Sequence, residues 1–287
     1  MAAALATEAG RRLLRLRAGR GFADPRALKD AGDRESHEYL MAELAARRPG
    51  DAVLSEEGKD DAARLTADRV WIVDPLDGTR EFGEEGRTDW AVHVALWERG
   101  TLVAGAVALP AEGRTLATTA EGAADIADMG MASPLRVRDL VDAGRIRVAV
   151  SRTRPPAFLR PLTARLEGQQ VEVEPVEIGS AGAKIAAVLL GRVDAYLHAG
   201  GQYEWDSAAP AAVALAAGAH ASRIDGAPLE YNRADPRLPD ILVCHRGLAA
   251  TLLAGIQSVT GQPSASAVPA DSSPTGTAST EAPPTDA

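Results

Sequence analysis

Apolar residues recur with two different periods in the first half of the chain. Helical spacing over residues 5–48 predicts two helices around a loop rich in Gly, Asp and Pro. Short apolar runs at residues 53–55 and 71–73 then predict strands that end directly in acidic residues. The apolar runs 90–97 and 102–109 predict a β-hairpin, so this half is expected to be α+β.

From about residue 141, predicted strands alternate with predicted helices. Strands are expected at residues 146–150, 171–178, 193–198 and 241–244, and helices at 156–166, at 183–190 and from Asp206. The pattern predicts an α/β half, residues 141–261, packed against the α+β half, residues 1–140. After Gly261 the composition shifts to Ser, Thr, Pro and Ala without aromatic residues, so residues 262–287 are predicted to be disordered.

The segment 71–79 reads Trp-Ile-Val-Asp-Pro-Leu-Asp-Gly-Thr, a strand whose end carries two carboxylates. Pro75 biases the preceding residue toward an extended conformation, so a bend can bring Asp74 and Asp77 to one side. Two carboxylates held that close repel each other unless a cation lies between them. Gly78 permits close backbone approach, and the amides after it could open a helix that favours a phosphate. An ordinary Asp-Gly turn stays open as the alternative.

Two further acidic elements lie elsewhere in the chain. Ser-Glu-Glu-Gly at residues 55–58 follows the shorter predicted strand, and a solvated loop is the alternative for its Glu pair. Tyr-Glu-Trp-Asp-Ser at residues 203–207 precedes the small, apolar run 208–218. That run predicts a tightly packed helix with Asp206 as N-cap and Pro210 in its first turn, and capping alone is the alternative role of Asp206.

In this order and spacing, the three acidic motifs resemble those of the inositol monophosphatase-like superfamily of magnesium-dependent, lithium-sensitive phosphatases, over roughly residues 5–255. The extension Thr79-Arg80-Glu81-Phe82 is similar to the CysQ branch, the 3'(2'),5'-bisphosphate nucleotidases. The resemblance implies a layered αβαβα sandwich. Because Asp206 lies in the second half and the other acids lie in the first, the metal site is expected at their junction.

Carried over by position, the resemblance implies a role for each matching residue. The implied metal ligands are Glu56, Asp74, the Leu76 carbonyl, Asp77 and Asp206. Asp33 would pair with Thr79 to orient the attacking water and would help to hold a weaker third metal, and Glu57 would be a second water-positioning acid. The backbone from Leu76 through Gly78 to Thr79, with the Thr79 hydroxyl, would cradle the phosphate.

One position departs from the family pattern. The family usually has Thr three residues before the acid that matches Asp33, whereas this chain has Asp30. The departure weakens the match at Asp33. A second interpretation, in which Asp30 and Asp33 cap a helix at residues 35–44, stays open.

Basic and polar groups are expected to select the substrate. Ser151-Arg152 after a predicted strand is similar to a Ser-Arg segment of the bisphosphate nucleotidases, and residues 179–184 resemble their Gly-Ser-Ser-x-Lys run with one residue more. Helix-start amides and Lys184 can hold a second phosphate or a ribose hydroxyl. A solvated Arg152 and a snorkelling Lys184 are the alternatives. The expected substrate contacts are Glu56, Leu76, Asp77, Gly78, Thr79, Arg152, Ser180, Lys184 and Asp206.

The expected chemistry follows from charge. Phosphate-ester hydrolysis needs charge cancellation on the phosphoryl group and a nucleophilic water, and an oxygen-rich ligand set suits two, or three, Mg²⁺ ions. We expect hydrolysis of 3'-phosphoadenosine 5'-phosphate, or its 5'-phosphosulfate, to AMP or adenosine 5'-phosphosulfate. Inositol monophosphate and fructose 1,6-bisphosphate are alternative substrates. A non-catalytic, metal-dependent nucleotide-binding protein is the alternative class.

Composition limits the kinds of binding partner that we expect for this chain. The net charge of −9 argues against a nucleic-acid polymer or an anionic membrane surface, while a small phosphate ester remains admissible next to bound metal. No apolar run of about 18 residues predicts a membrane span. The single cysteine, Cys244, fits a reducing cytoplasm and is expected in the core. His93 is expected to be a packed sheet residue and Asp89 a solvated loop residue, and a homodimer stays open.

Overall fold

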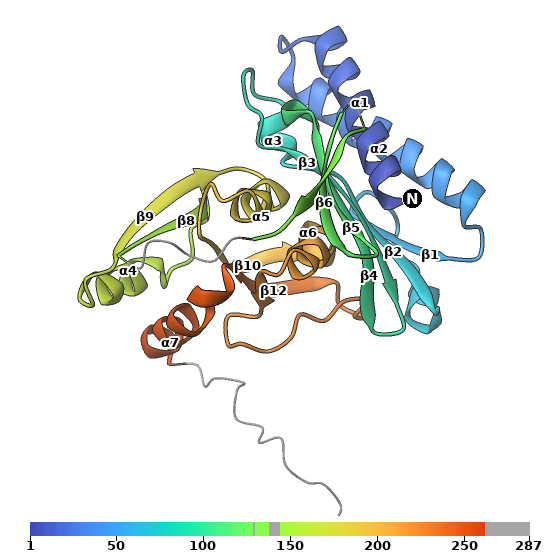
Figure 1. The fold of residues 1–287 in the computed structure, drawn as a ribbon. Coiled ribbons are helices and arrows are strands. Elements are labelled where there is room, and N and C mark those ends of the chain that lie inside the picture. The colour runs from blue at the N-terminus through green and yellow to red at the C-terminus, as the bar shows by residue number, and fades with distance from the viewer. Residues whose placement is uncertain (129, 138–143, 262–287) are drawn as a thin grey trace, which may run out of the picture.

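The computed structural model describes residues 1–128, 130–137 and 144–261 (Figure 1). Two predictions fall on residues outside these ranges: the boundary between the halves at residues 140 and 141, and the disorder of residues 262–287. Each of the two sheets lies on one side of that boundary, with strands between residues 52 and 135 in the first and between residues 145 and 244 in the second.

The first sheet has seven strands in chain order. They are β1 (Ala52–Ser55), β2 (Arg69–Asp77), β3 (Ala91–Glu98), β4 (Thr101–Leu109), β5 (Arg114–Thr119), β6 (Gly122–Ala127) and β7 (Ala132–Leu135). β1 and β2 are parallel, and each later neighbour pairs antiparallel. The predicted hairpin is confirmed as β3 and β4, whereas β5, β6 and β7 were not predicted.

The second sheet has the strand order β11-β12-β10-β8-β9. Its strands are β8 (Arg145–Ser151), β9 (Glu172–Ile178), β10 (Ala195–Tyr203), β11 (His220–Ser222) and β12 (Arg237–Cys244). β8 pairs in parallel with β9 and β10, while β12 is antiparallel to β10 and β11. The four strands predicted for this half are confirmed, and β11 is an addition.

Helices complete five layers (Figure 1). α1 (Ala2–Arg20) and α2 (Pro25–Arg47) cover the outer face of the first sheet, and α4 (Leu159–Glu167) and α7 (Ala249–Thr260) cover the outer face of the second. α5 (Ala181–Leu189) and α6 (Glu204–Ala216) lie between the sheets. The predicted αβαβα sandwich is confirmed.

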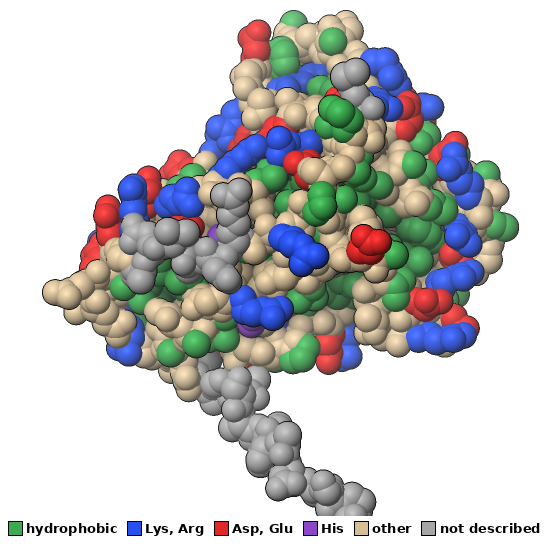
Figure 2. Space-filling model, viewed as in Figure 1, with side chains coloured by type: hydrophobic (Ala, Val, Ile, Leu, Met, Phe, Trp, Pro, Cys, Tyr) green, Lys and Arg blue, Asp and Glu red, His purple; other side chains and the backbone are tan. Residues whose placement is uncertain are grey.

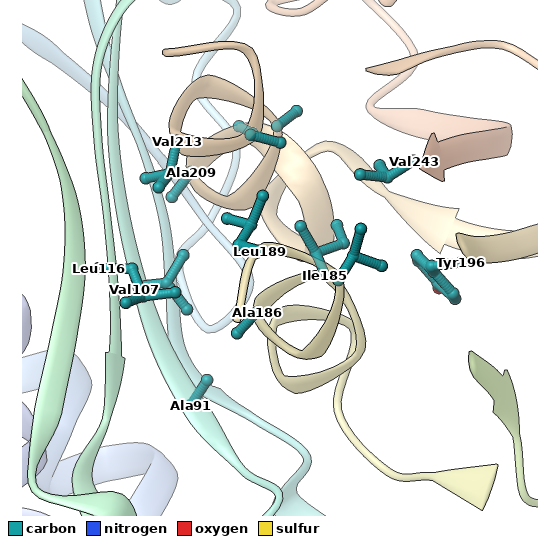
Figure 3. Packing of buried hydrophobic residues seen from close by; sticks show 14 of the residues in the cluster. Ala91, Val107, Leu116, Ile185, Ala186, Leu189, Tyr196, Ala209, Val213 and Val243 are labelled. Carbon is teal, nitrogen blue, oxygen red and sulfur yellow. The ribbon is translucent and has the colours of Figure 1, made fainter. Parts of the chain in front are cut away.

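Because side chains alternate between the two faces of a strand, the first sheet contributes residues to two hydrophobic cores. In β2, Val70 and Ile72 join the central core between the sheets, while Trp71 and Val73 join the core under α1 and α2. Figure 3 shows the central core, where side chains of α5 and α6 meet side chains of both sheets. Small residues allow this close packing: a Cβ at Gly105 of β4 would lie 2.7 Å from the Ala209 carbonyl oxygen of α6.

Two predicted helix starts are wrong. α6 begins at Glu204 with Tyr203 as N-cap, so Asp206 is its third residue and accepts a 2.7 Å hydrogen bond from the Tyr203 N–H. Pro210 therefore lies in the helix interior rather than in the first turn.

The N-cap of α2 is Asp24, which accepts from the Ala27 N–H, so Asp30 and Asp33 lie well inside a helix that begins at Pro25. The capping interpretation of these two acids is thereby excluded.

The helices described here include none long and apolar enough to cross a membrane. On the face shown in Figure 2, Lys and Arg side chains are interspersed with Asp and Glu. Cys244 is fully buried in the core under α4 and α7, as predicted, and burial raises the pKa of its thiol to about 12.

Candidate metal and phosphate site

The end of β2 is bent so that two acids three residues apart reach the same space. The register between β2 and β3 shifts between Asp74 and Asp77, which breaks the alternation that would point them to opposite faces. The Ser36 hydroxyl, from α2, donates a 2.7 Å hydrogen bond to the Pro75 carbonyl and holds the bend. Asp74 is buried, with Oδ1 accepting from the Leu76 N–H at 3.0 Å.

A third acid reaches this point from the other half of the chain. Carboxylate oxygens of Asp74, Asp77 and Asp206 lie within 4.8 Å of one another. Asp206 is mounted in the first turn of α6, where its bond to the Tyr203 N–H fixes its direction. The structure therefore brings the acids of two separated motifs together at the junction of the halves, while their role as metal ligands stays a prediction.

The charges of these acids are poorly compensated by the protein. Burial, and then the charges of Glu56 and Asp77, raise the pKa of Asp74 well above its ordinary value. Partial desolvation, followed by the charge of Asp206, raises the pKa of Glu56 to about 8, although this side chain is exposed at the site's edge. Burial and the charge of Asp77 raise the pKa of Asp206 to about 7.

Such a cluster fits a cation. Oδ2 of the buried Asp74 accepts no hydrogen bond from a donor group of the described residues, and its charged neighbour is the carboxyl of Glu56. A buried, unpartnered carboxylate oxygen is costly unless another group satisfies it. The donors gathered here are oxygens, the ligands that hard divalent ions prefer. These residues therefore fit a hard divalent cation.

Asp77 also joins the two halves directly. It accepts hydrogen bonds from the Ser180 hydroxyl at 2.5 Å, the Gly182 N–H at 2.6 Å and the Ala181 N–H at 3.2 Å. Ser180 is itself the N-cap of α5 and accepts from the Ala183 N–H. Because the start of a helix presents free N–H groups, the Asp77 carboxylate fits this end of α5.

The predicted helix opening at residues 179–184 is confirmed. Gly78, with a φ of 85°, is needed beneath it, since a Cβ there would lie 2.9 Å from the Ser180 Cβ.

The predicted water-orienting pair lies on the α2 side of the site. The Thr79 hydroxyl is 3.3 Å from Asp33 Oδ1 and 3.0 Å from the Leu76 carbonyl oxygen. Its single proton can be given to only one of these acceptors at a time. Burial, and then the charge of the exposed Glu57, raise the pKa of Asp33 to about 7. Asp30, Asp33 and Glu57 line one pocket of about 400 Å³.

A second pocket, of about 480 Å³, opens beside the acid cluster and is lined by both halves of the chain. Its walls include seven of the nine predicted substrate contacts: Asp77, Gly78, Thr79, Arg152, Ser180, Lys184 and Asp206. Glu56 and Leu76 are not among the described residues that line it.

The two predicted substrate cations are both engaged by the protein. Arg152 forms ion pairs with Glu81 at 2.6 Å and Glu84 at 3.2 Å, so a freely solvated Arg152 is excluded. Lys184 is buried, with Nζ donating to the carbonyls of Gly179 and Ile178, so the snorkelling alternative is wrong. Burial lowers the Lys184 pKa.

The sequence did not reveal the contacts that His93 and Asp89 make at the site. The buried His93 lies with Nε2 3.2 Å from Asp77 Oδ2, and its Nδ1 donates to the Trp205 carbonyl at 3.1 Å. Gly182 is required opposite this ring, because a Cβ there would lie 2.0 Å from Nε2. His93 is packed in the sheet, as predicted, and its ring lies between Asp77 and the Trp205 carbonyl, with no hydrogen-bond partner for Nε2 among the described residues.

The prediction that Asp89 is a solvated loop residue is wrong, because its carboxylate pairs with Arg87 and accepts from the Gly179 N–H at 2.6 Å. Strand alternation indicates which face a residue occupies. It carries no signal for a partner some ninety residues away, as Gly179 is from Asp89.

A model of the inositol monophosphatase family matches residues 3–260. The chain belongs to the inositol monophosphatase family. It is 53% identical over 272 residues to a protein named 3'-phosphoadenosine 5'-phosphate phosphatase from Mycobacterium leprae, covering 90% of this chain and 93% of that protein. It is 35% identical over 202 residues to the 3'(2'),5'-bisphosphate nucleotidase CysQ of Escherichia coli, covering 70% and 78%.

Among solved structures, CysQ from Bacteroides thetaiotaomicron matches with a TM-score of 0.69 at 28% identity, covering 84% of this chain and 94% of that one. The inositol monophosphatase family consists of metal-dependent phosphatases. In this chain the acid cluster and the adjoining pocket share Asp77 and Asp206.

Proposed function

We propose that the protein hydrolyses the 3'-phosphate of 3'-phosphoadenosine 5'-phosphate, giving AMP and phosphate, and acts likewise on the 5'-phosphosulfate. The observation that carries this proposal is the convergence of Asp74, Asp77 and Asp206 beside a pocket of about 480 Å³ lined by basic residues from both halves. The names of the relatives from Mycobacterium leprae and Escherichia coli support the choice of substrate.

We assign Mg²⁺ as the metal, with two ions and a weaker third. Asp74, Asp77 and Asp206 would hold it together with Glu56 and the Leu76 carbonyl, and the unpartnered Asp74 Oδ2 supports this assignment. When bound, Mg²⁺ supplies positive charge that offsets the charge of a phosphoryl group and makes water more acidic.

The protein's own groups then account for binding and proton transfer. The backbone from Leu76 to Thr79 receives the 3'-phosphate, and Gly78 lets this backbone pack closely against Ser180. The Thr79 hydroxyl, placed between Asp33 and the Leu76 carbonyl, fixes the direction of the Asp33 carboxylate. Asp33 is thus placed to accept a proton from the attacking water, and Glu57 assists it from the same pocket.

Three expectations from the sequence remain proposals. A division into halves 1–140 and 141–261 is supported by the two sheets, each of which uses strands from only one half. A cytoplasmic location is supported only by the single, buried cysteine. A homodimer is the third.

The test is phosphate release with Mg²⁺ from 3'-phosphoadenosine 5'-phosphate, inositol 1-phosphate and fructose 1,6-bisphosphate, each with and without Li⁺. The proposal expects the highest kcat/KM on the nucleotide and inhibition by Li⁺. A preference for inositol 1-phosphate or fructose 1,6-bisphosphate would overturn the nucleotidase assignment but not the assignment as a phosphatase. Binding of the nucleotide without turnover of any substrate would instead favour the non-catalytic class.

A further inference from the structure

Four basic residues line the pocket of about 480 Å³: Arg80, Arg152, Arg154 and Lys184. They differ in whether other residues of the protein already pair with them. Lys184 donates to backbone carbonyls, and Arg152 is held by two glutamates. Arg80 and Arg154 form neither an ion pair nor a side-chain hydrogen bond with any described residue. Their guanidinium groups are therefore available to an anionic ligand, whereas the charge of Arg152 is already compensated.

The Arg154 side chain packs against β10 at Gly201, where the strand has no side chain. A Cβ at Gly201 would be 2.8 Å from Arg154 Nη1, so the guanidinium rests against bare backbone. Gly200 and Gly201 have φ values of 81° and 73°, and the register between β10 and β12 shifts at this point. The His198 Nε2–H donates to the Gly200 carbonyl at 2.6 Å and holds the bulge.

The backbone that carries Arg154 is fixed before any ligand binds. The Ser151 hydroxyl accepts from the N–H groups of Thr153 at 3.4 Å and Arg154 at 3.2 Å. Pro155 and Pro156 follow, and the second proline is buried. Because proline locks φ, this turn costs little entropy to hold in place when a ligand arrives.

The charge of Arg154 is felt inside the pocket. Burial, with smaller contributions from the charges of Lys184 and Arg154, lowers the pKa of His198 to about 4. His198 lies on β10 of the second half, and Gly78 and Thr79 of the first half line the same pocket. The pocket therefore joins the phosphate cradle of the first half to the unpaired Arg154 guanidinium of the second.

We propose that Arg154, rather than Arg152, binds the second anionic group of the substrate, the 5'-phosphate of a nucleoside 3',5'-bisphosphate. This inference rests on the proposed function and names the residue that separates bisphosphorylated nucleotides from monophosphates. A guanidinium suits the task because it gives two parallel hydrogen bonds to one phosphate. Arg80 is also unpaired, but it follows the phosphate cradle directly in sequence, which favours a contact with the 3'-phosphate rather than with the 5'-phosphate.

The experiment compares Arg154→Gln, Arg154→Lys and Arg80→Gln with the wild-type protein. The matched control is Arg160→Gln, an exposed arginine at the start of α4 outside the pocket. KM is measured in Mg²⁺ for 3'-phosphoadenosine 5'-phosphate and for adenosine 3'-monophosphate, which keeps the ester but lacks the 5'-phosphate. Inhibition constants are measured for AMP, which keeps the 5'-phosphate, and for inorganic phosphate.

For Arg154→Gln we expect KM for the bisphosphate and the inhibition constant of AMP to rise about 10- to 100-fold, the usual effect of losing a charge-assisted contact. KM for the monophosphate and inhibition by inorganic phosphate stay within about twofold. Arg154→Lys recovers part of the loss because it keeps the charge but not the paired donors.

Equal losses for both nucleotides, no loss in Arg154→Gln, or a selective loss in Arg80→Gln alone would overturn the inference while the proposed function stands. If the wild-type protein releases no phosphate from the bisphosphate, the proposed function fails, and the assignment of Arg154 fails with it.

Discussion

The Ser180 hydroxyl donates a 2.5 Å hydrogen bond to Asp77 Oδ2 and so ties the start of α5 to the end of β2. This contact crosses between the two halves of the chain at the point where the acid cluster forms. Ser180 also caps α5 through its bond from the Ala183 N–H. One small side chain thus holds both the geometry of a candidate metal ligand and the position of a helix.

Ser180→Ala is expected to lower both stability and activity. Loss of the helix cap and of the bond to Asp77 should reduce the free energy of unfolding by about 1–2 kcal/mol. Because Asp77 is then less well held, kcat should fall and the Mg²⁺ concentration for half-maximal activity should rise. Urea unfolding and phosphate release measure the two effects. Ser133→Ala, at an exposed serine of β7, is the control and should stay within about 0.5 kcal/mol.

Asp74→Asn is expected to abolish most activity without unfolding the protein. Asparagine keeps the side-chain volume but removes the negative charge of a carboxylate whose Oδ2 has no hydrogen-bond partner among the described residues. Turnover should fall at least about 100-fold, as when one electrostatic stabiliser of a transition state is lost. In metal-free buffer the variant should be no less stable than wild type, because burial and neighbouring acids disfavour the Asp74 charge.

The control for Asp74→Asn is Asp235→Asn, at an exposed aspartate that accepts from the Arg237 N–H, a bond an amide oxygen can also accept. Thermal unfolding with and without Mg²⁺ separates metal binding from folding. Near-wild-type turnover, or the full stabilisation by Mg²⁺ that wild type shows, would remove Asp74 from the ligand set.

His93 is expected to act as a positioning residue for Asp77. His93→Gln keeps a polar side chain but loses the ring that lies between Asp77 and the Trp205 carbonyl. We expect kcat to fall about 10- to 100-fold and the Mg²⁺ requirement to rise, the usual effect of losing a group that orients a metal ligand.

A purely structural role of His93 would lower stability without changing the Mg²⁺ dependence, so a Mg²⁺ titration of activity is the deciding measurement. His220→Gln, at a histidine of β11 whose side chain hydrogen-bonds only to Ser222 among the described residues, is the matched control.

Local sequence patterns were sufficient to predict the end of β2 and the presence of α5 and α6, although not the residue at which α6 begins. The run Trp71-Ile72-Val73 is strongly apolar, and its acids and glycine follow at once, so both the strand and the polar groups at its end can be read from neighbouring residues. Strands β5, β6 and β7 were missed because small residues such as Ala123 and Ala124 give a weak alternation, and Pro134 is unusual in a strand.

Long-range contacts explain the other differences. Arg152 is paired with Glu81 and Glu84, about 70 residues earlier in the chain, and nothing near Arg152 in the sequence indicates this pairing. The same holds for the bond between Asp89 and the Gly179 N–H. The resemblance to a family located the acids, but only the packing of the two halves shows which basic residues of the pocket are left unpaired.

His198 is expected to contribute an acid-sensitive part of the stability. Burial lowers its pKa to about 4 in the folded protein, against an ordinary value of 6.5, so the unfolded chain binds the proton more readily. This contribution is fully present above about pH 7 and is lost as pH falls toward 4, amounting to about 2 kcal/mol between pH 7 and pH 5. The raised pKa values of Asp33, Glu56 and Asp206 act in the opposite direction in metal-free protein, so the measurement is the difference between wild type and His198→Gln. Urea unfolding at both pH values should show a change from pH 7 to pH 5 that is about 2 kcal/mol less favourable in wild type than in His198→Gln. An equal change in both would remove His198 from the pH dependence of stability.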